Sequence, residues 1–210
     1  MERDEAQARM AEIQRIMERA TLYTLLPGVP AVIGGLLVLV GCGVSYALIR
    51  SPDFADMLRM SWNAQVGFCW MWFAIGCIGV VQEIVLTARA ARRQGISPTA
   101  RPARFCAFSL TPSVVVAAVL TYKFLVVATP ESVRYIVPAW MMLYGTGVYT
   151  AGLFSVRPPR VLGLTFIAAG ALALLLYPDY GVVAAALSFG LLHVLFGAYV
   201  LHKTRQSTQP

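Results

Sequence analysis

Charged residues are scarce in this chain. Only 13% of its 210 residues are Asp, Glu, Lys or Arg, whereas a typical soluble domain carries about 25%. Hydrophobic residues make up 58%, and the mean hydropathy is +0.68. This balance argues against a soluble domain and indicates an integral membrane protein, with a length that allows one membrane domain and little else.

The residue types that build metal and redox sites are also few. No CxxC pair or nearby histidine accompanies the four cysteines, which disfavours a zinc site or a thioredoxin-like redox pair. The cysteines are Cys42, Cys69, Cys77 and Cys106. A bis-histidine haem is disfavoured because the two histidines, His193 and His202, lie in one apolar run. There is no phosphate loop, hydrolase elbow, HExxH or paired-carboxylate motif. We therefore expect no cofactor, no metal and no enzymatic activity.

The first residues do not have the pattern of a cleavable signal. They read "MERDEAQARMAEIQRIMERA", which mixes acids and bases and is longer than a signal n-region, so we expect the first apolar span to remain as an anchor. Apolar residues recur here every three or four positions, from Ala6 to Ala20. This spacing predicts an amphipathic helix over residues 1–21 that lies on the membrane surface, covers the ends of the bundle or pairs with a partner.

Six apolar stretches are long enough to cross a hydrocarbon core of ~30 Å, which needs about 20 helical residues. They lie near residues 24–49, 62–87, 107–129, 135–155, 159–177 and 180–202. Their apolar runs are continuous rather than alternating, which excludes a barrel. We predict an all-α polytopic membrane protein with six transmembrane helices in a compact bundle over residues 22–203. The amphipathic helix precedes this bundle, and a cytoplasmic tail, 204–210, follows it.

Basic residues are distributed unequally between the two ends of these spans. If the N-terminus is cytoplasmic, the inner segments hold thirteen of the seventeen bases. Only Arg50, Arg59 and Arg134 lie outside, and Lys123 lies within a span. This asymmetry predicts that both termini are cytoplasmic. It also explains the formal charge of +7 without nucleic acid.

The connection at 88–104 is the longest between spans and contains five arginines and no acid. These are Arg89, Arg92, Arg93, Arg101 and Arg104. The loop is expected to set the topology near anionic headgroups, or to dock an anionic ligand or an acidic partner.

Glycines recur at intervals of seven in four of the spans. The pairs are Gly34 and Gly41, Gly145 and Gly152, Gly163 and Gly170, and Gly190 and Gly197. Seven residues return to nearly the same face of a helix, so each pair predicts a stripe along which helices pack closely. The stripes could join helices within one bundle or between the subunits of a homo-oligomer. The third span has no glycine and is expected to be peripheral.

The last two spans are predicted to form a hairpin around "LLLYPDYG". Together with Gly163, Gly170, Gly190 and Gly197, this hairpin resembles the HdeD-like bacterial membrane proteins, which are small six-helix inner-membrane proteins. The resemblance covers about 40 residues of the chain. It implies a bacterial inner-membrane location and a role in acid stress or membrane integrity, without a catalytic site.

Two charged residues within the spans allow alternative interpretations. Lys123 lies in the third span, near its outer end, where its ammonium could reach the headgroups. Alternatively, it faces the bundle and binds an anion or pairs with Asp53, Asp56 or Glu131. Glu83 lies near the inner boundary of the second span, where it forms an ion pair, is solvated or serves as a protonatable group on a transport path.

Three uncharged polar residues are further candidates. His193 lies near the middle of the last span. It could hydrogen-bond a neighbouring helix, contact a ligand or relay protons. Asn63 and Gln65, at the outer start of the second span, could line an outward-facing cavity or solvate the helix end.

These features predict a non-enzymatic inner-membrane protein that acts as a binding, sensing or accessory component. Its partners would be the lipid bilayer and a second copy or another protein. The alternative function is a small-solute or ion transporter or channel with polar points at His193, Lys123 and Glu83.

Overall fold

A computed structural model describes residues 28–93, 101–153 and 157–206, together with the helical residues Glu5, Gln7, Arg9 and Met10. These residues form helices and no strand. The long helices are α2 (Gly28–Ile49), α3 (Trp62–Arg93), α4 (Arg101–Val127), α6 (Ile136–Leu153) and α7 (Arg157–Leu176). The last helix is continuous and consists of α8 (Gly181–Ala185), a π-helical segment η3 (Ala186–Leu192) and α9 (His193–Gln206). Short segments η1 (Phe54–Arg59), α5 (Pro130–Arg134) and η2 (Pro178–Tyr180) lie between the long helices.

Local sequence explains where several helices begin and end. Thr129 caps α5 in a capping box with Ser132, and Pro130 follows in the first turn, where its missing N–H costs no hydrogen bond. Two helices end in left-handed residues: Arg50 (φ 55°) follows α2 and Ala128 (φ 50°) follows α4. A left-handed residue after the last turn closes a helix, although glycine adopts this conformation with less strain.

Five helical segments are long and apolar enough to cross a membrane. They are Gly28–Ile49, Trp62–Arg93, Phe108–Val127, Arg157–Leu176 and Pro178–Thr204. Helix α6, which covers the expected fourth span, is not among them. Its 18 residues include Trp140, Tyr144 and Tyr149, which lower its hydropathy.

The connection between the second and third spans is shorter than expected. Helix α3 continues to Arg93 and α4 begins at Arg101, so the prediction of a loop over 88–104 is wrong. Helical backbone extends through the basic residues at both of its ends, because arginine and alanine are good helix formers. Residues 94–100 lie outside the described part.

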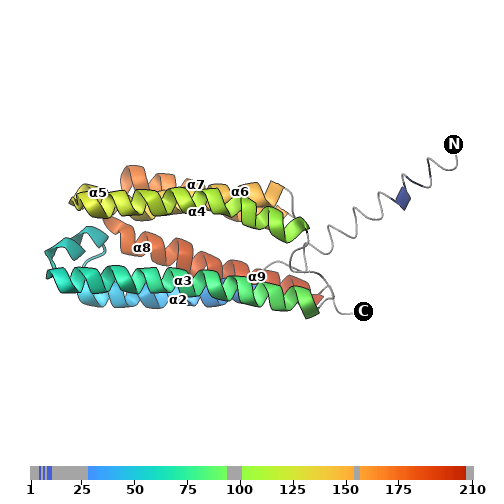
Figure 1. The fold of residues 1–210 in the computed structure, drawn as a ribbon, viewed down its shortest axis with the longest axis horizontal. Helices are drawn as coiled ribbons and strands as arrows, with labels where there is room; N and C mark the ends of the chain where they lie inside the picture. Colours follow the sequence, from blue (N-terminus) through green and yellow to red (C-terminus); the bar gives the residue numbers. More distant parts are fainter. Residues whose placement is uncertain are drawn as a thin grey trace.

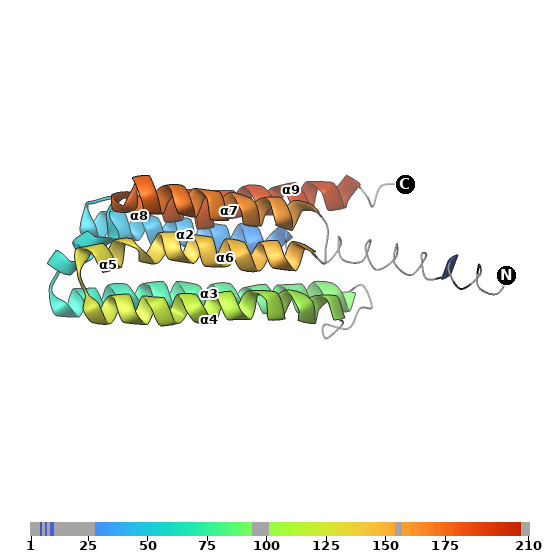
Figure 2. The same ribbon diagram turned by 90° about the horizontal axis from the view of Figure 1, so that it is seen from above.

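The long helices form two groups (Figure 1), and in the view from above α4 of one group overlaps α3 of the other (Figure 2). In the α2 group, α2 packs against α3, η3 and α9; in the α6 group, α6 packs against α7 and α4. Segment α8 contacts α2, α6 and α7, whereas η3 and α9 pack mainly on α2, so the last helix starts between the two groups and continues along the α2 group (Figure 1). We call the end with η1, α5 and η2 the loop end, and the end with Arg93 the basic end.

Glycines allow the closest backbone approaches within both groups. A Cβ added at Gly145 would lie 2.7 Å from the Gly163 carbonyl oxygen, where α6 meets α7. A Cβ at Gly197 would lie 2.5 Å from the oxygen of Gly28, and one at Gly35 would lie 2.6 Å from that of Gly190. Each helix pair therefore approaches more closely than any side chain would allow.

The remaining glycines of the predicted stripes meet side chains or neighbouring turns. Gly41 lies against Ile75, Gly152 against Arg160 and Gly170 against Met142. Gly34 differs, because its nearest neighbour would be the Gln82 amide nitrogen at 3.5 Å, an ordinary contact. The close approach in this part of α2 is made by Gly35.

The short turn at Pro178 joins the last two long helices as the predicted hairpin requires, but each of them packs mainly on another helix. Helix α7 packs most extensively on α6, and α9 packs on α2. Phe166 is the main contact of α7 with the last helix, against Phe189 and His193. The short turn at Pro178 therefore joins helices that belong mainly to different groups.

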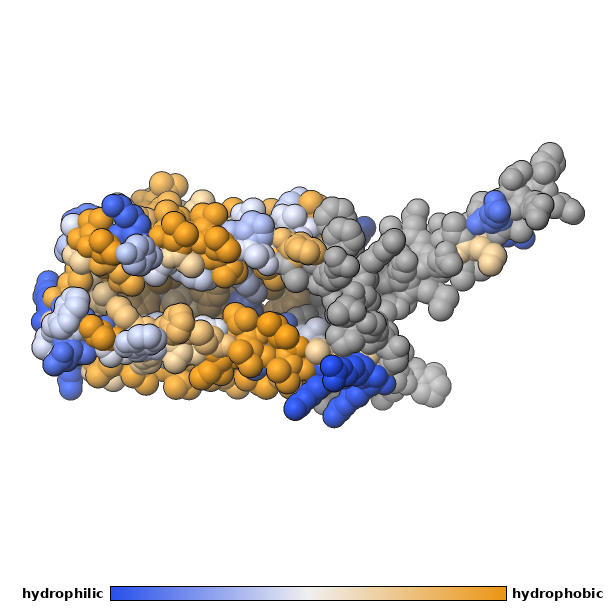
Figure 3. Space-filling view, in the orientation of Figure 1, coloured by the Kyte–Doolittle hydropathy of each residue, from blue (hydrophilic) through white to orange (hydrophobic). Residues whose placement is uncertain are grey.

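The surface is apolar along the helices and hydrophilic at the loop end and beside the last turns of α3 (Figure 3). The same view shows a hollow between the two groups. Helix α4 contacts α6 and contributes little to the buried core; Ala117 is its buried apolar residue among those described. This agrees with the peripheral position expected for the third span.

Candidate functional site

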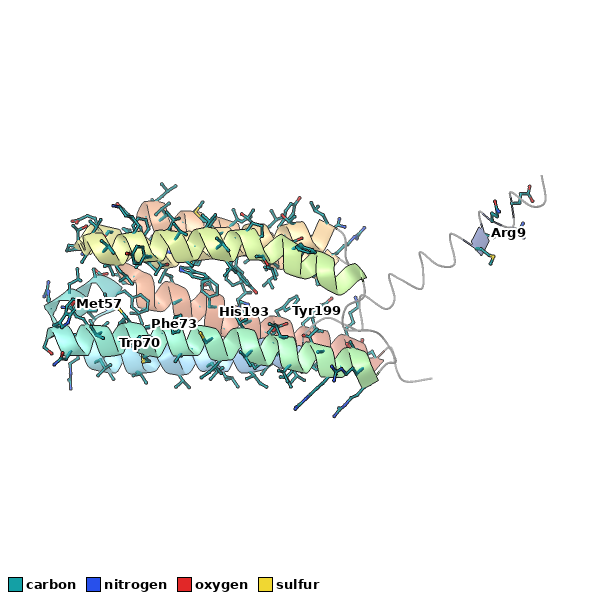
Figure 4. The ribbon with its side chains drawn as sticks, in the orientation of Figure 1. Arg9, Met57, Trp70, Phe73, His193 and Tyr199 are labelled. Carbon is teal, nitrogen blue, oxygen red and sulfur yellow. The ribbon has the colours of Figure 1, made fainter. Side chains whose placement is uncertain are left out.

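His193 and Tyr144 connect the two helix groups about halfway along their length. The Tyr144 hydroxyl and His193 Nε2 are 2.8 Å apart. His193 begins α9, about 18 Å from the start of the last helix at Gly181, and Tyr144 is in α6. Figure 4 shows His193 between the two groups. The polar contact therefore lies at mid-depth, far from both ends.

The hydrogen bonds of His193 determine its tautomer. Nδ1 lies 3.4 Å from the Ser188 carbonyl oxygen, which can only accept a hydrogen bond. In a neutral ring, Nδ1 therefore carries the hydrogen and Nε2 accepts the bond from the Tyr144 hydroxyl. Ser188 belongs to the π-helical segment, so the wider helical turn presents its carbonyl to the ring.

Aromatic rings enclose this pair. The Tyr144 ring centroid is 5.0 Å from that of Phe166 and 5.5 Å from that of Phe189, and Phe166 is 5.2 Å from His193. Phe166 has no exposed surface. Because the surrounding rings offer no strong acceptor or donor, each polar group of the pair depends on the other.

An ion-pair network holds the loop end together. Arg134 Nε donates to Asp53 Oδ2 at 2.7 Å and lies 2.9 Å from Asp179 Oδ1. Asp53 also accepts from the Ala55 N–H at 2.8 Å. The hydrogen bond to Asp53 raises the pKa of the Arg134 guanidinium, although partial desolvation opposes the shift. Through α5, η1 and η2, this network ties three separate turns of the chain.

Apolar packing supports the same end. Phe54 of η1 meets Phe68 and Trp72 edge-to-face, with centroids 5.9 and 5.5 Å away. The Trp72 indole N–H donates to Ser45 Oγ at 3.1 Å. The Val182 N–H donates to the Pro52 oxygen at 2.9 Å. The start of the last helix is thus fixed to the turn that follows α2.

Glu83 lies in α3, half-buried, and its carboxylate is 3.4 Å from the Thr87 hydroxyl. It forms no ion pair with the described residues, so the ion pair that its position near the inner boundary allowed is not seen there. Its neighbour Gln82 donates to the Pro30 oxygen at 3.1 Å and joins α3 to α2.

Lys123 is exposed on α4, away from the His193–Tyr144 pair. It has no ion pair among the described residues, because Asp53 is engaged by Arg134 and Asp56 by Arg59. Asn63 is exposed at the start of α3. Gln65 donates to the Leu58 and Met60 oxygens at 3.2 and 2.8 Å, which closes η1 against α3.

Arg89, Arg92 and Arg93 are exposed in the last turns of α3. Of Arg101 and Arg104, only the helical backbone in the first turns of α4 is described. Among the described residues, no three His, Cys, Asp or Glu side chains gather where they could hold a metal ion. The cysteines whose side chains are described, Cys42, Cys69 and Cys77, are free thiols.

Sequence analysis selected His193 and Glu83 but missed Tyr144 and Arg134. A tyrosine in the middle of a span was the available signal for Tyr144. No sequence pattern linked Arg134 to Asp53, since they are separated by two long helices.

No protein-family model matches this chain, and neither a curated protein nor a solved structure matches it.

Proposed function

We propose that this chain is a six-span protein of a bacterial cytoplasmic membrane, with both termini on the cytoplasmic side. Five segments have the length and hydropathy of membrane spans. Helix α6, with 18 residues, is about 27 Å long, close to the ~30 Å of a hydrocarbon core. It lies between α4 and α7, where a helix meets protein rather than lipid and tolerates more polar residues. The arginines of α3 support a cytoplasmic position of the basic end, because basic residues favour the cytoplasmic side of membrane proteins.

Within that membrane, the protein acts as a non-enzymatic binding or sensing component. The His193–Tyr144 hydrogen bond carries this proposal. It bridges two helix groups at mid-depth, and breaking it leaves an unpaired acceptor on half-buried His193 and an unpaired donor on half-buried Tyr144. A small, mostly apolar ligand with one hydrogen-bond donor can compete with Tyr144 for Nε2. Binding would then change the contact between the groups.

Transport of a small solute or ion is a second candidate, favoured by Glu83. This carboxylate is half-buried and has no counter-charge in the described part of the chain. Glu83 is thus a half-buried acid within a span, and His193 lies between the two helix groups (Figure 4). Lys123, the third expected point, is exposed on α4.

Thiol labelling distinguishes the two candidates. Single cysteines at positions 193, 83 and 123 in a cysteine-free background are treated with a membrane-impermeant reagent from each side. Arg59, which is exposed at the loop end, supplies a labelled control position. Leu175, with 76% exposure on an apolar surface, supplies a lipid-facing control that should stay unlabelled.

The binding proposal expects position 193 to be silent from both sides and position 123 to be labelled only from the loop end. Labelling of positions 193 and 83 from the basic end would show an aqueous path to mid-depth. That result would overturn the proposal in favour of transport.

A further inference from the structure

A shallow groove runs along one face of α3, beside α2. It has a volume of about 410 Å³ and is bordered by Cys77, Ile78, Val81, Gln82, Val85 and Leu86. Ile78, Val81 and Val85 are 52%, 60% and 40% exposed. The Gln82 amide bonds the Pro30 oxygen of α2, so the Gln82 side chain is held against the groove wall. What remains open to a ligand is hydrocarbon surface.

The same face of α3 continues into three arginines. Ile78, Gln82, Val85, Arg89 and Arg92 follow one another at steps of four, three, four and three, which keeps them in one row. The groove residues 77–86 cover about 14 Å of helix, and Arg89 begins less than one turn beyond them. Arg93, one residue further, extends the basic surface. The apolar groove therefore ends directly at exposed guanidinium groups.

Within the described part of the chain, no acid pairs with these guanidiniums. Residues 84–104 contain no acid, and Arg89, Arg92 and Arg93 form no ion pair with the described residues. A phosphate diester suits them, because arginine binds phosphate oxygens with two parallel N–H donors. Helix α3, with 32 residues, is about 48 Å long. This exceeds the hydrocarbon core and places its last turns among the headgroups.

We propose that this face of α3 binds an anionic phospholipid of the inner leaflet. One acyl chain lies in the groove along Ile78, Val81 and Val85, and the phosphodiester is held by Arg89 and Arg92, with Arg93 beside them. A single lipid molecule thus covers the apolar groove with its acyl chain and neutralises the arginines with its phosphate. A second copy with the same face would add three more arginines to those already there, which electrostatic repulsion opposes.

Native mass spectrometry of the full chain, released from detergent with phosphatidylglycerol or phosphatidylcholine, tests the site. The double variant Arg89→Gln, Arg92→Gln is compared with Arg9→Gln, Arg157→Gln, which removes the same charge from exposed positions away from the groove. A juxtamembrane arginine contributes about 1 kcal/mol of attraction to anionic lipid. We therefore expect a roughly tenfold or greater loss of phosphatidylglycerol affinity in the first variant and less than twofold in the second.

A third variant tests the groove. Val85→Trp leaves the arginines in place and occupies the space of the acyl chain, so we expect at least a threefold loss of phosphatidylglycerol affinity. Equal losses in the two arginine variants would show general surface attraction and refute the site. Unchanged affinity in Val85→Trp would mean that the groove does not bind the chain. Equal binding of both lipids by the wild type, or a dimer that forms through this face without lipid, would also overturn the proposal. None of these outcomes depends on the role of His193.

Discussion

Replacing Arg134 by glutamine removes the charge that joins η1, α5 and η2 at the loop end. Asp53 would lose its 2.7 Å partner and keep only the Ala55 N–H. The Asp53 side chain is 8% exposed, whereas that of Arg134 is 33% exposed. Breaking a fully buried pair costs about 3–5 kcal/mol, and breaking an exposed one costs about 0–1 kcal/mol. With solvent screening at Arg134, we expect a loss of about 1–2 kcal/mol in the free energy of unfolding.

For a chain of this size, that loss corresponds to a fall in Tm of about 3–6 °C, measured by thermal unfolding in detergent. Asp179 is the internal control, because its side chain is 58% exposed. Asp179→Asn should therefore lower Tm by less than about 2 °C. In the double variant Asp53→Asn, Arg134→Gln, the losses should be less than additive, since both remove one interaction. Equal effects of Arg134→Gln and Asp179→Asn, or strict additivity with Asp53→Asn, would refute this account of the loop end.

Three further predictions use the same assay. Gly35→Ala should lower the free energy of unfolding by about 1–3 kcal/mol, because its Cβ would lie 2.6 Å from the Gly190 oxygen. The control Gly34→Ala should leave the free energy of unfolding unchanged or raise it. Equal effects of the two substitutions would contradict the close contact between Gly35 and the last helix. Tyr144→Phe should lower the free energy of unfolding by about 0.6–1.7 kcal/mol, because the hydrogen bond to His193 is lost. An unchanged Tm would show that this hydrogen bond does not stabilise the contact between the two helix groups. Ala128→Gly should raise the free energy of unfolding by up to about 1 kcal/mol, because φ is 50° there; a loss would mean that the left-handed turn is not formed.

The helices were largely predictable from sequence, because long apolar runs leave few alternatives to a helix in lipid. Their extension through Arg89 to Arg93 was not predicted. Charge marks the end of an apolar run, but it does not end a helix when alanine and arginine continue it. The fourth span was predicted as an apolar stretch of sufficient length, and α6 shows that a helix between two others can carry Tyr144 and Trp140, which lower its hydropathy.

Helix pairing was harder to predict. Gly163, Gly170, Gly190 and Gly197 lie in consecutive spans with matching spacing, which favoured a hairpin of the last two helices. In the structure, Gly163 lies against α6, and Gly197 lies against α2. The spacing of glycines shows which face of a helix carries small residues, but shape complementarity over the whole face decides which helix packs against it. The His193–Tyr144 contact depends on which helices pack together, so it could not be predicted from the sequence.

The π-helical segment at Ala186–Leu192 has a consequence for how this last helix tolerates changes in length. A π-turn holds one residue more than an α-turn, so deleting one residue there would restore a regular helix instead of breaking it. The residues beyond it would then rotate by about 100° relative to those before it. His193 would leave Tyr144, and Gly197 would leave Gly28. In this helix, an insertion of one residue is thus what allows His193 to meet Tyr144 while Gly197 meets Gly28.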